Sequence, residues 1–455
     1  MNIKLLFLGS ASMLIVATAP AQQVDPALKL LIKQAFNESH SLHINQLKTT
    51  QVKVNRTMAK QFFLPKISTA ATYTHLNDDI VFPPQTQQLL LGTQRLLIKE
   101  KIGVPFNAAL PASITLKPVP PIQDNNIFKI TSNAQVILFS GFKSALSQKA
   151  TLRQENALQY QASVAQVAIV KDIWETYDKL ALVNSSDKVI EAIDDYLHAQ
   201  NRFVEKAISN GLATPLEREK INLARQKLVL KKIELQGNKK MLLEKLAMLT
   251  GQEVGNLSGL NPTLEVLLAA DEPAQIRPEL LAIDEGIKAL ELKRKIELTE
   301  YIPKLAAFGQ YEWRKNDLSL FDPRWFAGIR LQWNLFDGFN AKNEAKKVSI
   351  EKEILVHQRI EAEKNSSLTI IKTSIDKETA EAKIVTNTEA LRLAEKITDL
   401  TDKQYKNGLT NITEWLDAMA GLEKAKQEVL ISNYEQRIAM ANLLQAKGQL
   451  LNILQ

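Results

Sequence analysis

The chain of 455 residues is long enough for two or three ordinary domains or one extended structure, and its 45% hydrophobic and 24% charged residues are ordinary for a folded protein. Its 57 basic and 50 acidic residues give a net charge of +7 and are mixed along the chain, which favours solvated helix faces over a nucleic-acid-binding patch. The absence of cysteine excludes disulfides and thiolate-ligated metals, and the 6% of aromatic residues is typical of long helices.

Residues 1–21 have the features of a secretory signal peptide. Lys4 supplies the positive start, an apolar run follows it, and Ala19-Pro20-Ala21 matches a small-residue cleavage site. An ordinary buried first helix is the alternative. No later run approaches the roughly 20 apolar residues of a membrane-spanning helix. An exported chain of this kind is therefore soluble in the periplasm, secreted, or held in a membrane as a β-barrel.

Helical and strand periodicity alternate in the next part of the chain. Residues 25–63 have helical spacing, with Asp25 and Pro26 suited to the first turn and Pro65 beyond the end. Four later runs have a period of two, and each has one apolar and one polar face. These runs cover residues 66–73, 128–138, 305–313 and 325–335.

The four alternating runs match barrel strands that face lipid on one side and water on the other. Aromatic residues lie near the ends of the runs, where interfacial girdles form: Tyr311, Trp313, Trp325 and Trp333. A half-buried sheet of a soluble protein is the alternative, because it alternates in the same way. Four strands cannot close a barrel by themselves, so several chains would have to share one barrel, and three chains would give twelve strands.

The loop inside the first strand pair is longer than the loop inside the second. Pro65 and Pro303 begin the two strand pairs and lie 238 residues apart. Matching positions further along the two halves of the chain, described below, lie 197 residues apart. The first strand pair therefore contains 41 additional residues. The extra residues fall within about 77–125. The prolines of this segment exclude a continuous helix or a central strand, and we expect an external loop.

Long helical segments occupy most of the remaining chain. The predicted helices are 141–209, 214–250, 340–406 and 411–451. The two longest would each span roughly 100 Å. We expect segments 25–63 and 275–301 to complete the shorter sides, which gives a cylinder of antiparallel helices. Residues 251–274, rich in Gly, Asn and Pro, are predicted to form an equatorial linker beside the cylinder.

Four landmarks recur at a single spacing. Each of the following pairs is separated by 197 residues: Leu138 and Leu335, Asn210 and Asn407, Glu217 and Glu414, Gly251 and Gly448. Four matches in register indicate an internal duplication. We therefore divide the mature chain into a first repeat at 22–250, the linker at 251–274 and a second repeat at 275–455.

The duplicated halves, the Phe-x-Gly-Phe motif between strand and helix, and the turn of residues 405–418 resemble the TolC-like outer-membrane efflux proteins, or outer-membrane factors. The resemblance covers essentially the whole mature chain. It implies a mainly α fold with a membrane β-barrel. Duplicated long antiparallel helical hairpins would form an α-barrel in the periplasm. Four strands per protomer would contribute to a trimeric twelve-stranded barrel in the outer membrane of a Gram-negative bacterium.

The resemblance also implies a function. The homotrimer would be the passive exit duct of a tripartite efflux or type I secretion system, working with a periplasmic adaptor (membrane fusion protein) and an inner-membrane pump. The sequence itself contains no phosphate-binding loop, no metal cluster and no Ser/His/Asp set with a local signature, so we expect no enzyme activity, cofactor or metal. The mixed charges lead us to expect no nucleic-acid partner either. A periplasmic coiled-coil adaptor or a structural spacer is the alternative, but neither would contain four amphipathic strands. His40 and His43 have no third ligand at metal-binding spacing, so we expect solvated histidines.

Carried over onto this sequence, the acidic ring at the closed periplasmic end of the family falls on Glu414 and Asp417. These residues are three apart on the first turn of a predicted helix, so both can face one side. Threefold repetition would place six carboxylates around the mouth, which favours cations. A simpler interpretation is that acidic groups near a helix start interact with the helix dipole, and this alone explains Glu217.

The family also joins neighbouring hairpins near their tips through a tyrosine and an acidic residue, here Tyr405 and Glu217. The basic residue found in some members corresponds to Thr410, so the resemblance leaves open how the closed state is held. The two hairpin tips are the expected adaptor contacts. They comprise Asn210, Gly211, Leu212, Asn407, Gly408 and Leu409.

Overall fold

A computed structural model describes residues 25–267, 273–314 and 324–454, so the predicted signal peptide and part of the predicted linker lie outside the described residues. The chain divides into two compact units. The helical unit contains the described residues up to 52 together with 153–288 and 353–454. The strand unit contains 53–152 and 289–352, less the residues that are not described.

The strand unit contains all four predicted strands, so this part of the predicted fold is confirmed. They are β1 Lys66–His75, β2 Asn126–Phe139, β3 Lys304–Arg314 and β4 Trp325–Gln332. The strands form one antiparallel sheet in the order β1-β2-β3-β4. Gln332 pairs with Lys304, the first residue of β3, so Trp333 and Leu335 have no strand residue opposite them. For this reason β4 ends before these two residues, although the alternation had included them.

Aromatic rings gather at the end of β3. The ring centroids of Tyr311 and Trp313 are 4.8 Å apart. The indole Nε1 of Trp313 donates a hydrogen bond to Ser132 Oγ on β2 at 2.8 Å, while the side chain is 62% exposed. An exposed ring with one satisfied polar atom suits a boundary between water and an apolar phase.

The loop between β1 and β2 contains a helix that the sequence analysis did not predict. This helix, α3, covers Pro84–Ile102 and ends at Gly103, whose φ is +71°. Proline breaks a helix only from within, and the stretch between Pro84 and Pro105 contains none. The sequence analysis thus missed a helix of 19 residues inside the loop, while the external position of the loop stays a prediction.

The first predicted helix, residues 25–63, is also divided. It consists of α1 Pro26–Glu38, α2 His40–Lys60 and the short 3-10 helix η1 Gln61–Phe63. Ser39 separates α1 from α2 with an extended backbone, and its Oγ accepts a hydrogen bond from the Leu42 amide at 3.4 Å. Ser39 thus caps the start of α2, and the second helix begins directly after the first. Because no residues are inserted between the two helices, the helical spacing of the sequence continues across the break.

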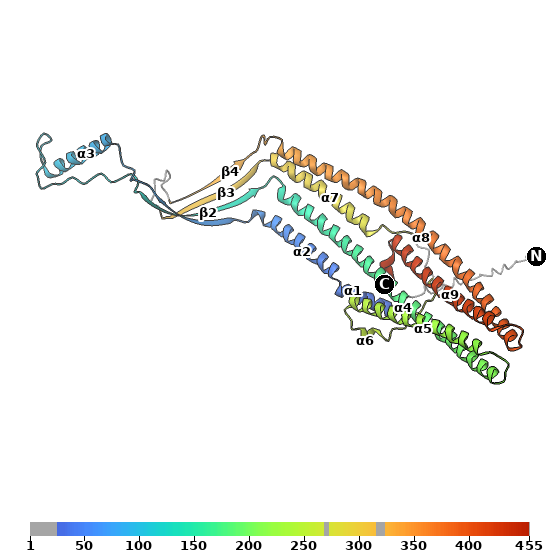
Figure 1. Cartoon of the computed structure of the whole chain (residues 1–455). Helices are drawn as coiled ribbons and strands as arrows, with labels where there is room; N and C mark the ends of the chain where they lie inside the picture. Colours follow the sequence, from blue (N-terminus) through green and yellow to red (C-terminus); the bar gives the residue numbers. More distant parts are fainter. Residues whose placement is uncertain (1–24, 268–272, 315–323, 455) are drawn as a thin grey trace, which may run out of the picture. The chain divides into compact units, whose positions relative to one another are not determined.

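Two helical hairpins account for nearly half of the chain (Figure 1). The first consists of α4 Lys143–Ser209 and α5 Pro215–Thr250, and the second consists of α8 Asn340–Lys406 and α9 Ile412–Ala446. The other helices are α6 Val254–Leu257, α7 Pro278–Leu298, η2 Thr299–Tyr301 and η3 Leu450–Leu454. None of the helices in the described parts of the chain combines the length and the apolar character that crossing a bilayer requires.

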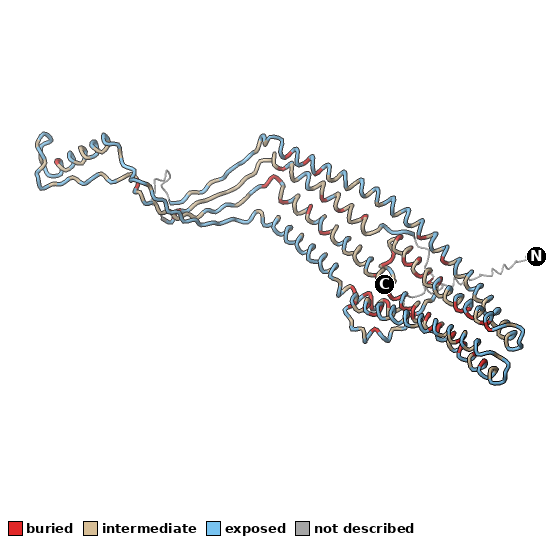
Figure 2. The backbone as a smooth tube through the Cα atoms, viewed as in Figure 1, coloured by how far each residue is buried: buried red, intermediate tan, exposed pale blue. Residues whose placement is uncertain are grey.

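The largest core of the helical unit forms where α1 packs against α4, α5 and the end of the chain. Figure 2 shows buried residues along these helices. Trp174 and Tyr177 of α4 are among the largest buried side chains. Their partners include Leu28, Ile32, Leu246, Leu257, Met440 and Leu450. Burial of each large aliphatic side chain contributes roughly 1.5–3 kcal/mol to the free energy of folding. This core therefore stabilises the packing of the hairpins against α1.

Candidate functional site

The two hairpin tips have the same backbone geometry. Gly211 and Gly408 have φ values of +72° and +70°, a conformation that glycine adopts without steric cost. At each tip the residue after the glycine donates its amide back into the preceding helix: Leu212 to Ala207 O at 2.8 Å, and Leu409 to Gln404 O at 2.9 Å. These bonds close each helix in a Schellman arrangement. The arrangement leaves Leu212 81% exposed and Leu409 76% exposed.

The first two turns of α9 carry the two acidic residues expected at the periplasmic mouth: Glu414 lies in the first turn, whereas Asp417 lies in the second and not, as expected, in the first. Asn411 caps the helix, because its Oδ1 accepts from the amides of Thr413 and Glu414 at 2.9 and 3.1 Å. Glu414 and Asp417 are both exposed. The Glu414 carboxylate accepts a hydrogen bond from Thr410 Oγ1. Both carboxylates are thus available at the surface close to the positive end of the helix dipole.

Tyr405 and Glu217 lie in contact although they belong to different hairpins. The phenol Oη of Tyr405 donates to Glu217 Oε2 at 2.5 Å. Burial, and then the hydrogen bond to this carboxylate, raise the pKa of Tyr405 above its ordinary value. Its ring also packs edge-on against Phe203 of α4, with the centroids 6.2 Å apart. Tyr405 therefore remains a neutral donor that connects the end of α8 to the start of α5.

Two further bonds, which the sequence analysis did not predict, connect α5 to α9. Lys220 Nζ donates to Thr413 Oγ1 at 2.8 Å. Lys231 Nζ forms an ion pair with Glu423 Oε1 at 2.6 Å. The partners are 192 or 193 residues apart in sequence and belong to no recognisable motif, so no local pattern could have identified them.

An apolar cluster lies between these polar contacts. It is formed by Ile190, Ile193, Leu197, Val204, Ile221, Leu228, Ile412, Trp415, Met419 and Leu422. The indole Nε1 of the buried Trp415 donates to Asp402 Oδ1 at 3.1 Å, which satisfies its polar atom. The cluster draws on α4, α5 and α9, so it holds the two hairpins together near their tips.

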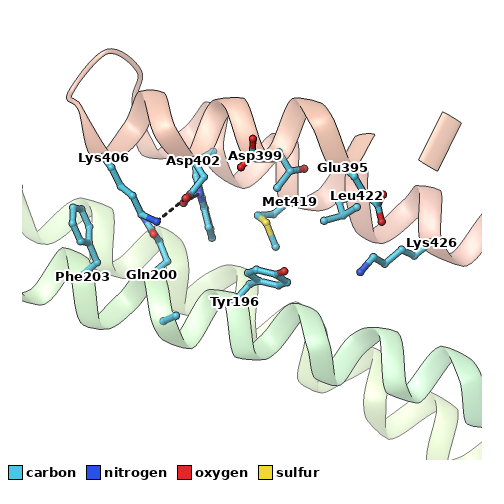
Figure 3. A pocket seen from close by; sticks show the side chains of 13 residues that line it. Tyr196, Gln200, Phe203, Glu395, Asp399, Asp402, Lys406, Met419, Leu422 and Lys426 are labelled. Atoms are coloured by element: carbon cyan, nitrogen blue, oxygen red, sulfur yellow. Dashed lines mark hydrogen bonds and ion pairs between the residues drawn. The ribbon is translucent and has the colours of Figure 1, made fainter. Parts of the chain in front are cut away.

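A groove of about 680 Å³ opens beside the cluster, between α4 on one side and α8 with α9 on the other (Figure 3). Its α8 wall carries Glu395, Asp399 and Asp402, and its floor includes Met419 and Leu422. Tyr196 and Phe203 line the facing wall. Lys406 and Lys426 also line the groove, and Lys406 pairs with Asp402 at 2.7 Å (Figure 3). The groove therefore combines charged groups of both signs with an apolar surface.

A second polar cluster lies further along the hairpins, in the buried part of the helical unit. Asp178 of α4 and Arg437 of α9 form two hydrogen bonds of 2.8 Å, and their side chains are 0% and 7% exposed. Trp174 Nε1 donates to the same carboxylate at 2.8 Å. The Glu265 carbonyl accepts from Arg437 at 2.9 Å, which fastens the linker to α9.

No group of three or more His, Cys, Asp or Glu side chains in the described residues is arranged to hold a metal ion. His40 and His43, the pair considered from the sequence, are both exposed on α2.

Comparison with known proteins gives one family and several structures. Residues 270–449 match the family model of the outer membrane efflux protein. No curated protein matches the chain in sequence.

The solved structures that share the fold are outer-membrane or membrane proteins. VceC of Vibrio cholerae is 16% identical, with a TM-score of 0.70 over 93% of this chain and 96% of that one. A membrane protein of Pseudomonas aeruginosa is 14% identical, with a TM-score of 0.73 over 94% and 95%. The CmeC outer membrane channel of Campylobacter jejuni is 14% identical, with a TM-score of 0.70 over 94% and 86%. The fold is thus shared over nearly the whole of this chain.

Proposed function

We propose that this chain forms the exit duct of a tripartite efflux system. Its domain at residues 270–449 and its fold are those of a TolC-like outer-membrane efflux protein. One observation carries the proposal. The fold of outer-membrane proteins, the CmeC channel among them, is shared over more than nine-tenths of the chain. Transport through such a duct is passive, and the outer membrane is its location. Type I secretion is the other export route that this architecture would serve.

The proposed duct contains three copies of the chain. An open four-stranded sheet has unpaired edges, which lipid does not tolerate, and three copies would pair these edges in a twelve-stranded barrel. The helical unit also leaves apolar side chains exposed at heptad-like spacing. On α8 they include Ile354, Leu368, Ile371, Ile375 and Val385, and on α5 they include Leu216, Leu223, Leu230, Met241 and Met248. These stripes would be buried between copies.

Glu414 and Asp417 are proposed to form the selectivity ring of the closed mouth. Both are exposed on the first turns of α9, next to a hairpin tip. Three copies would bring six carboxylates to the mouth, and a ring of this charge attracts cations and repels anions.

The hairpin tips and the adjoining groove are proposed to receive the adaptor. The exposed Leu212 and Leu409 offer apolar contact at the two turns. In the acidic row of Glu395, Asp399 and Asp402, the two aspartates already pair with the exposed Lys403 and Lys406 of α8 at 2.6 and 2.7 Å. Basic side chains of an adaptor would therefore pair with Glu395 or replace these lysines in exposed, weak ion pairs. A helical hairpin with basic and aliphatic residues at its end has the complementary chemistry, and an inner-membrane pump would act through it.

The test is single-channel conductance of the detergent-extracted protein in a planar bilayer. Wild type should give small, cation-selective steps, and Glu414→Ala/Asp417→Ala should lose the selectivity. Asp376→Ala/Glu378→Ala is the matched control, because it removes the same charge from exposed sites on α8 roughly 40 Å from the tip. If the conductance steps keep their cation selectivity after the tip substitutions, the protein is a duct but Glu414 and Asp417 do not form its selectivity ring. No conductance from any variant would favour a periplasmic coiled-coil adaptor or spacer.

A further inference from the structure

We propose that Lys220 and Lys231 of α5 hold the hairpin tips in the closed arrangement by bonding α9, in place of the basic residue that the family resemblance expects at position 410. The inference rests on the proposed duct function and concerns how its mouth is kept closed. The closing cations are thus on the first hairpin rather than on the tip of the second.

Thr410 is unable to serve this role because its hydroxyl is used within its own hairpin. It donates to Glu414, four residues further along the chain. Such a bond stiffens the turn before α9, but it does not connect one hairpin to the other. Any cation that adds to the contact of Tyr405 with Glu217 between the hairpins must therefore come from elsewhere.

The ion pair of Lys231 with Glu423 has the properties of a closing contact. Its atoms are 2.6 Å apart, and the Glu423 side chain is only 11% exposed, whereas that of Lys231 is 49% exposed. If the hairpins separated, the carboxylate would lose the cation that compensates its burial. The lysine is mobile and hydrated, so the contact can break and form again without unfolding either helix.

Lys220 strengthens the same seam nearer to the tip. Lys220 and Lys231 are 11 residues apart, which places them on one face of α5 about 16 Å from each other. Between them on α5, Ile221 and Leu228 are buried in the apolar cluster with Ile412 and Leu422 of α9. The two lysines thus bond to α9 at both ends of an apolar seam.

The buried pair of Asp178 and Arg437 sets the limit of this movable region. Arg437 lies 14 residues beyond Glu423 on α9, a distance of roughly 21 Å. Its bidentate contact with Asp178 is almost completely shielded from water, so breaking it would leave two buried charges. We therefore expect the attachment at Arg437 to persist when the more exposed attachments at Glu423 and Thr413 break.

The experiment compares Lys231→Glu with the exchanged pair Lys231→Glu/Glu423→Lys. The open level in a planar bilayer should be occupied roughly tenfold more often in Lys231→Glu, which corresponds to the loss of one charge-assisted hydrogen bond. Main-chain hydrogen exchange of residues 412–422 should accelerate by a similar factor. The exchanged pair should return both values close to wild type. Lys220→Ala, which removes a bond to a neutral hydroxyl, should give roughly a threefold change.

Lys240→Glu is the matched control, because it makes the same charge change at an exposed site of α5. The proposal is overturned if this control opens the channel as much as Lys231→Glu does, or if the exchanged pair remains open. Hydrogen exchange decides the question independently of transport. If no variant conducts, the duct function fails, whereas accelerated exchange that is rescued by the exchanged pair still supports the closing contact.

Discussion

Tyr405 connects the two hairpins through a single phenolic proton, so its removal is a minimal test of the tip contact. In Tyr405→Phe the ring can still pack against Phe203, but Glu217 loses its donor. We expect open-level occupancy in a planar bilayer to rise roughly tenfold, the effect of one hydrogen bond to a charged group. Tyr196→Phe, which alters an exposed tyrosine of the groove on α4, should have no effect.

The pH dependence of this effect follows from the raised pKa of Tyr405. A raised pKa in the folded state means that the bond contributes fully below the ordinary tyrosine value near 10 and is lost only as the pH rises through the higher folded value. The difference in open-level occupancy between Tyr405→Phe and wild type should therefore be constant from about pH 6 to pH 9. A difference that disappears by pH 9 would contradict the assignment of the phenol as donor.

The sequence predicts a contact between two side chains only where both residues belong to a recognisable motif. Tyr405 and Glu217 were paired because the turn sequence resembles a known family, and the structure places them 2.5 Å apart. Lys231 and Glu423 could not be paired, since neither residue is unusual for a helix surface. Their contact depends on how α5 and α9 pack, which no local pattern records.

Single elements were predicted well where their ends carry strong backbone signals. The segment 340–406 was predicted as one helix, and α8 has these limits, with left-handed glycines at Gly338 before it and Gly408 after it. The signals for α3 were also present, with Pro84 at the start and Gly103 at the end, but the surrounding prolines obscured them. Ser39 marks a break that helical periodicity alone does not reveal.

The joint between α4 and α7 offers a test at the scale of elements. Glu285 of α7 is 9% exposed and accepts hydrogen bonds from Lys288, Asn156 and Arg153 at 2.7 to 3.2 Å. Burial acts to raise the pKa of Glu285, but these three donors together outweigh it and hold the pKa below its ordinary value. The stabilisation is thus present above the ordinary glutamate pKa near 4.3 and is lost as the pH falls through the lower folded value.

We expect Glu285→Gln to lower the free energy of unfolding by about 1–2 kcal/mol at pH 7, because it weakens charge-assisted hydrogen bonds at a buried site. The deficit should shrink as the pH falls below about 4. Thermal unfolding of the detergent-extracted protein measures both. Glu291→Gln, which disrupts only exposed ion pairs with Lys295 and Lys352, should cost less than about 0.5 kcal/mol. A deficit independent of pH would show that Glu285 acts through packing rather than charge.

At the scale of the whole molecule, the repeated landmarks correspond to repeated backbone geometry. Among the described residues, seven glycines have positive φ, and six of them form pairs separated by 197 residues: Gly141 and Gly338, Gly211 and Gly408, Gly251 and Gly448. The seventh, Gly103, lies in the long loop of the first strand pair. The two non-glycine residues with positive φ, Phe142 and Phe339, are separated by 197 as well. The turns therefore follow the repeat residue by residue.

The expectation that several chains assemble came from the open four-stranded sheet, not from any sequence motif. The argument that four strands cannot close a barrel requires further copies, and the helical unit independently leaves apolar stripes uncovered. On α8, Leu368, Ile371 and Ile375 are 65%, 58% and 57% exposed and follow the three-four spacing of a helix seam. Exposed aliphatic rows of this length are costly in water, and burial between copies would remove the cost.

We expect Ile371→Asp/Ile375→Asp to prevent trimer formation, because each substitution would bury a carboxylate in an apolar seam. Light scattering coupled to gel filtration of the detergent-extracted protein should show the mass of a single chain instead of three. Asn365→Asp/Thr369→Asp, which adds the same charge to exposed polar sites on the same part of α8, should remain trimeric. If both variants stay trimeric, the stripe lies outside the interface and the strands alone drive assembly. If both become monomeric, added charge anywhere on α8 is sufficient, and the apolar spacing has no special role.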